Sequence, residues 1–452
     1  MKKCTSCNSV ISVSEALFCP YCGFELRNQE RLCGKCGYTL QPDYKFCPIC
    51  GTSACFDKEV QPEVTKKPII DGEEGISTHR FRECGSDGMY YDYVTKRSDK
   101  FSYCINDKKP NDLRVIKIYR VMPDTVYFIT ADVMTKNVVN HENKESPIGA
   151  CISSGAFNCS SSLLGTSDWQ TVGVLGRSDD MGALEVSLNL GYNFNTCTGE
   201  AWFENINVTP AADYTSGKNT WRFLAVVVTD TGIDTIDRDT ARHVKLSHQM
   251  SPAERAAIKK SLSCFKTDLS KDAGGLFDVD VDLVEMSAKC TEYTKTNVGY
   301  TITAPSAREY LRKNGIDISG YDHVIMIACL PSLPAKYYGL GGSCIDGKIG
   351  YSFVLHTNAD KYIEYLNGRW DGMWAPAIYV HEFLHSIEAT SRALGLEVPK
   401  VDGERFGYSD RNEWREWYRD FIRKELKVGG KQLGVDPRIW KLRPSVFYIA
   451  KK

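Results

Sequence analysis

The stretch YVHEFLHSIEATSRALG, residues 379–395, carries two histidines four residues apart, with a glutamate directly after the first. If this stretch is helical, His381 and His385 lie one turn apart on the same face, so both imidazole rings can reach one metal ion. Glu382 would then stand beside that ion, where a carboxylate can take a proton from water. The spacing predicts a zinc site that activates water; the alternative is a pair of core histidines.

A zinc site of this kind needs a third protein ligand. The sequence holds no histidine after His385, so a downstream ligand has to be a carboxylate or a tyrosine. Asp402 and Glu404 lie in the loop-like stretch EVPKVDGERFGY, within reach of the end of the predicted helix. The residues themselves leave both candidates open.

Cysteines at the N-terminus form a second group with metal-ligand spacing. Eight of the 18 cysteines make four C-x-x-C pairs within the first 50 residues. Two thiolates on one tight turn can face one ion, and two such turns complete a tetrahedral site. Glycines follow three of the pairs, at Gly23, Gly37 and Gly51, where the turn needs a residue tolerant of positive φ. The predicted ligands are Cys4, Cys7, Cys19, Cys22, Cys33, Cys36, Cys47 and Cys50.

In the motifs CTSC…FCPYCG and CGKCG…FCPICG, residues 1–51 resemble the double zinc ribbon of bacterial and archaeal proteins. The resemblance implies two structural zinc ions and a recognition or regulatory module that binds a protein partner. A disulfide framework is the alternative, but it requires an oxidising compartment and a signal peptide, and the N-terminus has no apolar segment of that kind.

After the cysteines, the sequence pattern changes from a linker to short strands and then to alternating strands and helices. Residues 52–75 are polar and proline-containing without periodicity, which is typical of a linker. Residues 76–215 contain short alternating runs such as TVYFITADV and ALEVSLNLG, which predict an antiparallel β-sandwich. Residues 216–452 alternate strands with helices, including SPAERAAIKKSLSCF with a Ser251/Glu254 capping box and an edge strand at 348–355 before a helix over about 375–394.

Two stretches of the predicted sandwich, GTSDWQTVGV and GEAWFENINV, resemble carbohydrate-binding modules of the jelly-roll, galactose-binding-like type. The resemblance implies a jelly-roll fold and a glycan as a candidate ligand. Exposed aromatic rings would stack on sugars, but Trp169 and Trp202 fall within strand runs and are expected to be core residues.

The H-E-x-x-H helix and the strand order before it resemble the zincin metallopeptidases over residues 220–445. Metzincins place a glycine and a third histidine where this chain has Glu388 and Ser391, so the metzincin pattern does not apply. Some gluzincins have a glutamate after 18 intervening residues, which favours Glu404, although Asp402 in the same loop serves equally well. In many zincins a tyrosine stabilises the oxyanion; Tyr408 is the candidate here, with simple packing as the alternative.

These patterns predict a multidomain protein with small zinc ribbons, an all-β jelly-roll sandwich and an α+β zincin-like catalytic domain. The expected function is a zinc-dependent peptidase, an endopeptidase, with one catalytic and two structural zinc ions and a peptide or protein substrate. The alternatives are an inactive zincin-like scaffold and a zinc-ribbon protein associated with nucleic acid. A net charge of −1 argues against nucleic acid, and the lack of a long apolar run or leader favours a cytoplasmic protein with no membrane span.

Overall fold

The computed structural model divides the chain into two compact units, Met1–Thr65 and Lys66–Lys452. The structure describes residues 2–3, 10–11, 31–32, 39–41, 44, 46–51, 66–72, 75–81, 88–97, 100–142, 147–155, 158–215, 217–237, 239–296, 299–331, 339–345, 348–356, 376–408, 414–447 and 449. Among these residues, no helix combines the length and the apolar character that crossing a membrane requires.

The first unit contains two short antiparallel strand pairs, β1 (Lys2–Lys3) with β2 (Val10–Ile11) and β3 (Arg31–Leu32) with β4 (Thr39–Leu40). After β4, the buried Cys47 packs against Leu40, and the Gly51 amide donates to the Cys47 carbonyl at 2.9 Å. Gly51 has a φ of +65°, which confirms the positive φ expected after the Cys47/Cys50 pair. The remaining predicted ligands lie outside the described residues: Cys4, Cys7, Cys19, Cys22, Cys33 and Cys36.

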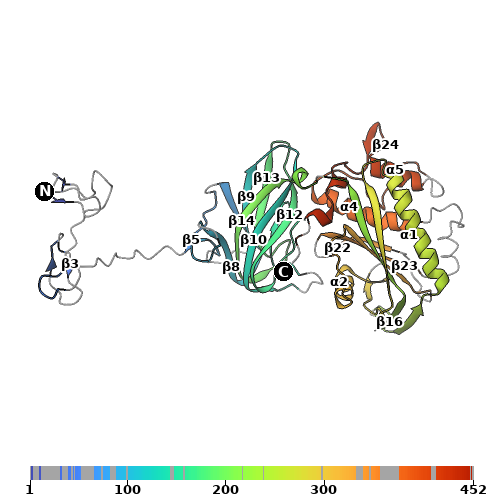
Figure 1. Ribbon diagram of the computed structural model, residues 1–452, viewed down its shortest axis with the longest axis horizontal. Coiled ribbons are helices and arrows are strands. Elements are labelled where there is room, and N and C mark those ends of the chain that lie inside the picture. Colours follow the sequence, from blue (N-terminus) through green and yellow to red (C-terminus); the bar gives the residue numbers. More distant parts are fainter. Residues whose placement is uncertain are drawn as a thin grey trace. The chain divides into compact units, whose positions relative to one another are not determined.

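The predicted β-sandwich is present at the start of the second unit (Figure 1). Its larger sheet has the strand order β12 (Gly165–Arg177), β10 (Val126–Asn140), β14 (Cys197–Pro210), β8 (Ser102–Asn111), β7 (Met89–Asp92) and β5 (Lys66–Pro68). The smaller sheet has the order β11 (Ala150–Ser153), β13 (Ala183–Leu190), β9 (Leu113–Arg120) and β6 (Ile76–Arg80). All neighbouring strands are antiparallel.

Alternating side chains build the core between the two sheets. Leu184, Val186 and Leu188 of β13 are at most 2% exposed and pack in one cluster with Ile129 and Val133 of β10. This period of two is the pattern that identified the strands in the sequence.

The predicted linker, residues 52–75, extends too far into the sandwich. β5 pairs with β7, and Ile69 just after it is buried in the sandwich core, so residues from Lys66 onward belong to the fold. A three-residue strand reading KKP has no detectable period, and its backbone hydrogen bonds to β7 hold it in place. Residues 52–65 lie outside the described part of the chain.

The second part of this unit is a five-stranded sheet covered on both faces by helices (Figure 1). The order is β18 (Asp278–Met286), β15 (Thr220–Val228), β21 (His323–Cys329), β23 (Ile349–His356) and β22 (Gly339–Ile345). The first four strands are parallel, and β22 is antiparallel at one edge. The edge strand predicted at 348–355 is therefore interior, and the glycine-rich stretch before it forms the edge.

Helices α1 (Pro252–Asp272) and α4 (Ala377–Ala393) share one apolar cluster on one face of the sheet, and α2 (Ala304–Lys313) packs in another cluster. The Ser251/Glu254 capping box of α1 is confirmed. The chain also forms β16 (Asp230–Ile236), β17 (His243–Gln249), β19 (Thr294–Thr296), β20 (Gly299–Thr301), α5 (Trp414–Arg423), β24 (Leu426–Val428), β25 (Lys431–Leu433), α6 (Pro444–Phe447) and the 3-10 turns η2 (Ala211–Tyr214) and η3 (Ile439–Lys441).

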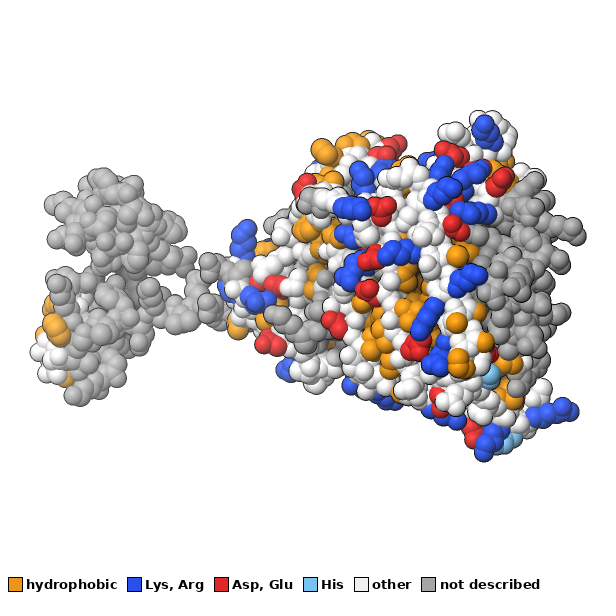
Figure 2. All heavy atoms as spheres, turned by 45° about the vertical axis from the view of Figure 1, so that its right-hand side comes forward, with side chains coloured by type: hydrophobic (Ala, Val, Ile, Leu, Met, Phe, Trp, Pro, Cys, Tyr) orange, Lys and Arg blue, Asp and Glu red, His pale blue; other side chains and the backbone are white. Residues whose placement is uncertain are grey.

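The sandwich and the five-stranded part share apolar core. Val126 and Phe128 of β10 belong to the cluster that contains α1 and α4, and the Phe128 ring stands 5.1 Å from that of Phe447 in α6. On the face shown in Figure 2, positive and negative side chains are interspersed.

Candidate metal centre

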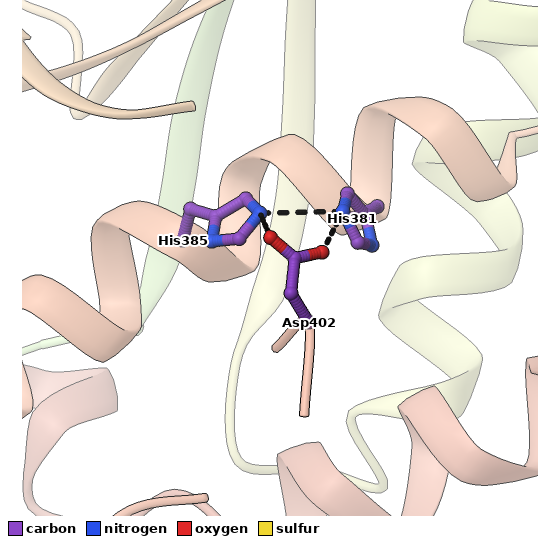
Figure 3. A group of neighbouring side chains, drawn as sticks. All are labelled: His381, His385 and Asp402. Carbon is purple, nitrogen blue, oxygen red and sulfur yellow. Dashed lines mark hydrogen bonds and ion pairs between the residues drawn. The ribbon is translucent and has the colours of Figure 1, made fainter. Parts of the chain in front are cut away.

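Helix α4 brings the two predicted histidines together. Its buried side, with Val380, Phe383 and Leu384, packs in the apolar core. This packing fixes the orientation of the helix and therefore the direction in which the histidine side chains point. His381 and His385 point to a common place from that face, with their Nε2 atoms 3.2 Å apart (Figure 3). Both rings are half-buried, with side-chain exposures of 16% and 21%.

Asp402 completes the group from the loop that follows α4 (Figure 3). Its Oδ1 lies 3.1 Å from His381 Nε2, and its Oδ2 lies 3.4 Å from His385 Nε2. The Asp402 side chain is 71% exposed, so solvent reaches the group from the loop side. Among the described residues, these three bring potential ligand atoms within 4.8 Å of one another.

The loop that carries Asp402 is tied to both neighbouring helices. The Val401 amide donates to Glu388 Oε2 of α4 at 2.7 Å, and Val401 itself is fully buried. Arg405 Nη1 donates to the Val401 carbonyl at 2.7 Å, and its guanidinium lies over the Trp417 ring of α5 at 4.2 Å. These contacts hold the residue before Asp402 in place from both sides.

Glu388 links three parts of the group. One carboxylate oxygen accepts from Arg392 Nε at 3.0 Å, an ion pair that their i, i+4 spacing on the helix favours. Its other oxygen accepts from Val401 and lies 3.9 Å from His385 Nδ1. Glu388 is thus placed to support a ligand ring and the ligand loop, without facing the space between the three ligand atoms.

The hydroxyl of Tyr418 in α5 lies 3.1 Å from His381 Nδ1, on the side of the ring away from Asp402. Sequence analysis missed this residue. The only sequence signal is its place on the apolar side of a strongly amphipathic helix, which does not tell a core tyrosine from a ligand-supporting one.

Glu382 is buried between α4 and the edge strand β22. A Cβ on Gly339 would overlap its carboxylate, and a Cβ on Gly341 would overlap its backbone carbonyl. These glycines allow the strand to approach the helix closely, and sequence analysis did not assign them this role. Burial, together with the negative charge of Asp402, raises the pKa of Glu382 to about 8. The pKa of His381 is lowered, first by burial and then by its neighbour His385, so its ring is neutral at pH 7 as a metal ligand must be.

The other two predicted site residues are not part of this group. Glu404 is exposed and lies outside the set of three. The Tyr408 hydroxyl donates to Asp420 Oδ2 in α5 at 2.6 Å, and burial and this carboxylate raise its pKa to about 12. To take part in a reaction at the histidines, Tyr408 would have to break its hydrogen bond with Asp420.

The geometry of the three residues suits one zinc ion. Zinc binds imidazole nitrogen and carboxylate oxygen at about 2.0–2.2 Å in a tetrahedron, so two of its ligand atoms stand about 3.4 Å apart. The two Nε2 atoms lie 3.2 Å apart, and they lie 3.1 Å and 3.4 Å from the two different oxygens of Asp402, distances close to that spacing. Three protein ligands are also the number that a catalytic zinc site uses.

The two tryptophans of the sandwich differ. Trp202 is 4% exposed, and its indole Nε1 donates to Asp92 Oδ2 at 3.0 Å, so the expectation of a core residue is confirmed. Trp169 is half-buried, and the expectation of a core residue is only partly met there.

Comparison with known proteins gives one family match, the double zinc ribbon, over residues 1–51. No curated protein matches the chain. A solved family 4 carbohydrate-binding module aligns at 14% identity, covering 32% of this chain and 96% of the module, with a TM-score of 0.21. A family 11 module from Clostridium thermocellum aligns at 11% identity over 32% and 95% of the two chains, with a TM-score of 0.20. Modules of a xylanase from the same organism align at 10% identity over 84% and 64%, with a TM-score of 0.21.

Proposed function

We propose that the chain is a zinc-dependent peptidase whose centre is His381, His385 and Asp402, with Glu382 as the general base. The observation that carries the proposal is the convergence of two imidazole nitrogens and the carboxylate of Asp402 on one place, the kind and number of ligands that a zinc ion takes. Zinc bound there would supply a Lewis acid that polarises a peptide carbonyl and acidifies water.

The chain's own residues account for the remaining requirements. His381 and His385 offer their Nε2 atoms, and Asp402 offers its carboxylate oxygens. Glu382 takes a proton from the attacking water while the water oxygen bonds to the carbonyl carbon of the peptide. It then passes that proton to the peptide nitrogen as the C–N bond breaks. Glu382 follows His381 directly on α4, and its carboxylate is held between α4 and β22; this fixed position beside the histidines favours the role.

Replacing Glu382 tests this proposal. Glu382→Gln should keep the fold and the third zinc ion but lower the rate of peptide cleavage by about 10²–10⁴-fold, the usual contribution of general acid–base catalysis. His385→Ala should lose that zinc ion, while the two ribbon ions stay. Glu397→Gln, the same change at an exposed position just beyond α4, is the matched control and should cleave like the parent.

Zinc content by elemental analysis and cleavage of an unfolded protein mixture, followed by mass spectrometry, are the two measurements. Cleavage by Glu382→Gln at the parent's rate would contradict the mechanism. A parent that holds three zinc ions and cleaves no peptide would favour the alternative function, a zincin-like scaffold without activity.

A further inference from the structure

His381 contacts protein groups on both sides of its ring. Nε2 faces Asp402 Oδ1 at 3.1 Å, and Nδ1 faces the hydroxyl of Tyr418 at 3.1 Å. We propose that Tyr418 is a positioning residue for the metal group, holding the His381 ring in its binding orientation both before and after the ion arrives. The inference rests on the proposed zinc site but not on the proposed hydrolysis.

A hydroxyl suits this position because it can donate and accept. Without metal, Nε2–H can donate to Asp402, and Nδ1 then accepts a hydrogen bond from Tyr418. When Nε2 binds a metal ion, the one ring proton has to sit on Nδ1, which then donates to the oxygen of Tyr418. The ring keeps a single proton in both states, and only the direction of the Tyr418 bond reverses. A carboxylate or a backbone carbonyl in this place would support the second state alone.

The surroundings of Tyr418 keep its hydroxyl in position. The side chain is 1% exposed, with the Trp417 ring centred 5.3 Å away. Two arginines of its helix bind the end of α1, Arg415 Nε to Asp272 Oδ2 at 2.8 Å and Arg423 Nε to the Asp272 carbonyl at 2.7 Å. Helices α1 and α4 pack in the same apolar cluster. The bonds from α5 to α1 therefore also fix the position of Tyr418 in α5 relative to His381 in α4.

The second ligand ring is held differently. His385 Nδ1 faces Glu388 Oε2 at 3.9 Å, which is longer than a hydrogen bond. Tyr418 therefore makes the short contact to the Nδ1 side of a ligand ring. Loss of this hydroxyl should weaken metal binding. Removing a group that orients a metal ligand typically costs 10–100-fold in affinity.

The test is zinc affinity of the full chain carrying Tyr418→Phe, measured by competition with a chelator. His385→Ala gives the signal of the ribbon ions, which is subtracted. Tyr310→Phe is the matched control, since Tyr310 is 4% exposed and its hydroxyl donates to the Ala288 carbonyl at 2.6 Å, in α2 and away from the histidines. Tyr418→Phe should bind zinc about 10–100-fold more weakly than the parent, and Tyr310→Phe should bind like the parent.

Equal affinity of Tyr418→Phe and parent would overturn the inference, as would an equal loss in both variants, which would indicate general destabilisation. A second measurement does not depend on the folding of any variant. With ¹⁵N-labelled histidine, the zinc-bound parent should show the His381 proton on Nδ1; a proton found on Nε2 would overturn the inference. A parent that binds zinc at this site but cleaves no peptide would contradict the proposed hydrolysis and leave the role of Tyr418 intact.

Discussion

Asp402 is the member of the proposed metal site that solvent reaches most easily, with 71% of its side chain exposed. An exposed carboxylate remains hydrated, so its charge costs little in free energy, and the lowered pKa of His381 keeps that half-buried ring neutral. The two kinds of ligand thus meet at the surface of the domain without a buried, unpaired charge.

Single substitutions can distinguish the two candidates for the third ligand, Asp402 and Glu404. Asp402→Ala should release the third zinc ion, as is expected of His385→Ala, because two imidazoles alone hold zinc poorly. Glu404→Ala should retain it, since Glu404 is exposed and outside the group of three. Elemental analysis of the purified variants measures the outcome. Retention of zinc by Asp402→Ala together with its loss from Glu404→Ala would mean that the loop rearranges around the ion.

Among the elements, the pairing of α4 with the edge strand β22 does most to define the site. Glycines at alternate positions of β22, Gly339 and Gly341, face the helix at Glu382. Side chains there would separate strand and helix, and the carboxylate of Glu382 would lose its buried position. A glycine-rich edge strand is therefore a requirement of this arrangement.

Alanine substitutions in β22 should distinguish the two contacts. Gly341→Ala places a methyl group against the backbone carbonyl of Glu382, which cannot rotate away, so the free energy of unfolding should fall by about 1–3 kcal/mol. Gly339→Ala meets the Glu382 side chain from its Oε1 back to its Cγ, which can rotate away, so its loss of stability should be smaller. Urea unfolding followed by tryptophan fluorescence gives both values. Equal losses would show that the strand does not approach the helix this closely.

In the Lys66–Lys452 unit as a whole, the sandwich is joined to the helix that carries the histidines. Arg177 of β12 lies 3.3 Å from the Gly395 carbonyl, just past the end of α4. Asp124, in the same sandwich, pairs with Arg438 at 3.0 Å. With Phe128 in the shared core, these contacts make the sandwich part of the support of the site, a different role from that of a tethered module.

Lys348 lies at this junction and should make stability depend on pH. Its Nζ donates to the Phe447 carbonyl at 3.1 Å and lies 5.2 Å from the Phe128 ring centre, and burial lowers its pKa from 10.5 to about 7. Between these values the unfolded chain holds a proton that the folded protein has lost, so stability rises with pH. The increase from one such group is at most about 1.4 kcal/mol per pH unit.

Lys348→Met isolates this contribution because it keeps the volume and removes the amine. Below pH 7 the parent bears the full cost of a buried charge, so the difference in unfolding free energy between parent and variant should shift in the parent's favour as pH rises from 7 to 10. Urea unfolding at several pH values measures that difference. A constant difference would mean that the amine is hydrated in the folded protein.

Local patterns were enough to predict several features of this chain. Alternation identified the strands of the sandwich, the Ser251/Glu254 box identified the start of α1, and the Cys47/Cys50 pair predicted the positive φ of Gly51. The helical spacing of His381 and His385 placed both rings on one face. Each of these features depends on residues within a few positions of one another, so the chain's own geometry decides them.

Tertiary structure decided the rest. Asp402 rather than Glu404 meets the histidines because Val401 is held by Glu388 of α4 and by Arg405, which stacks on Trp417 of α5. Strand β22 rather than residues 348–355 is the edge because it pairs on the outer side of β23. Tyr418 reaches His381 across 37 residues, through the packing of α5 on α1. Local sequence patterns cannot predict such contacts, because the contacts form only when distant elements pack in one core.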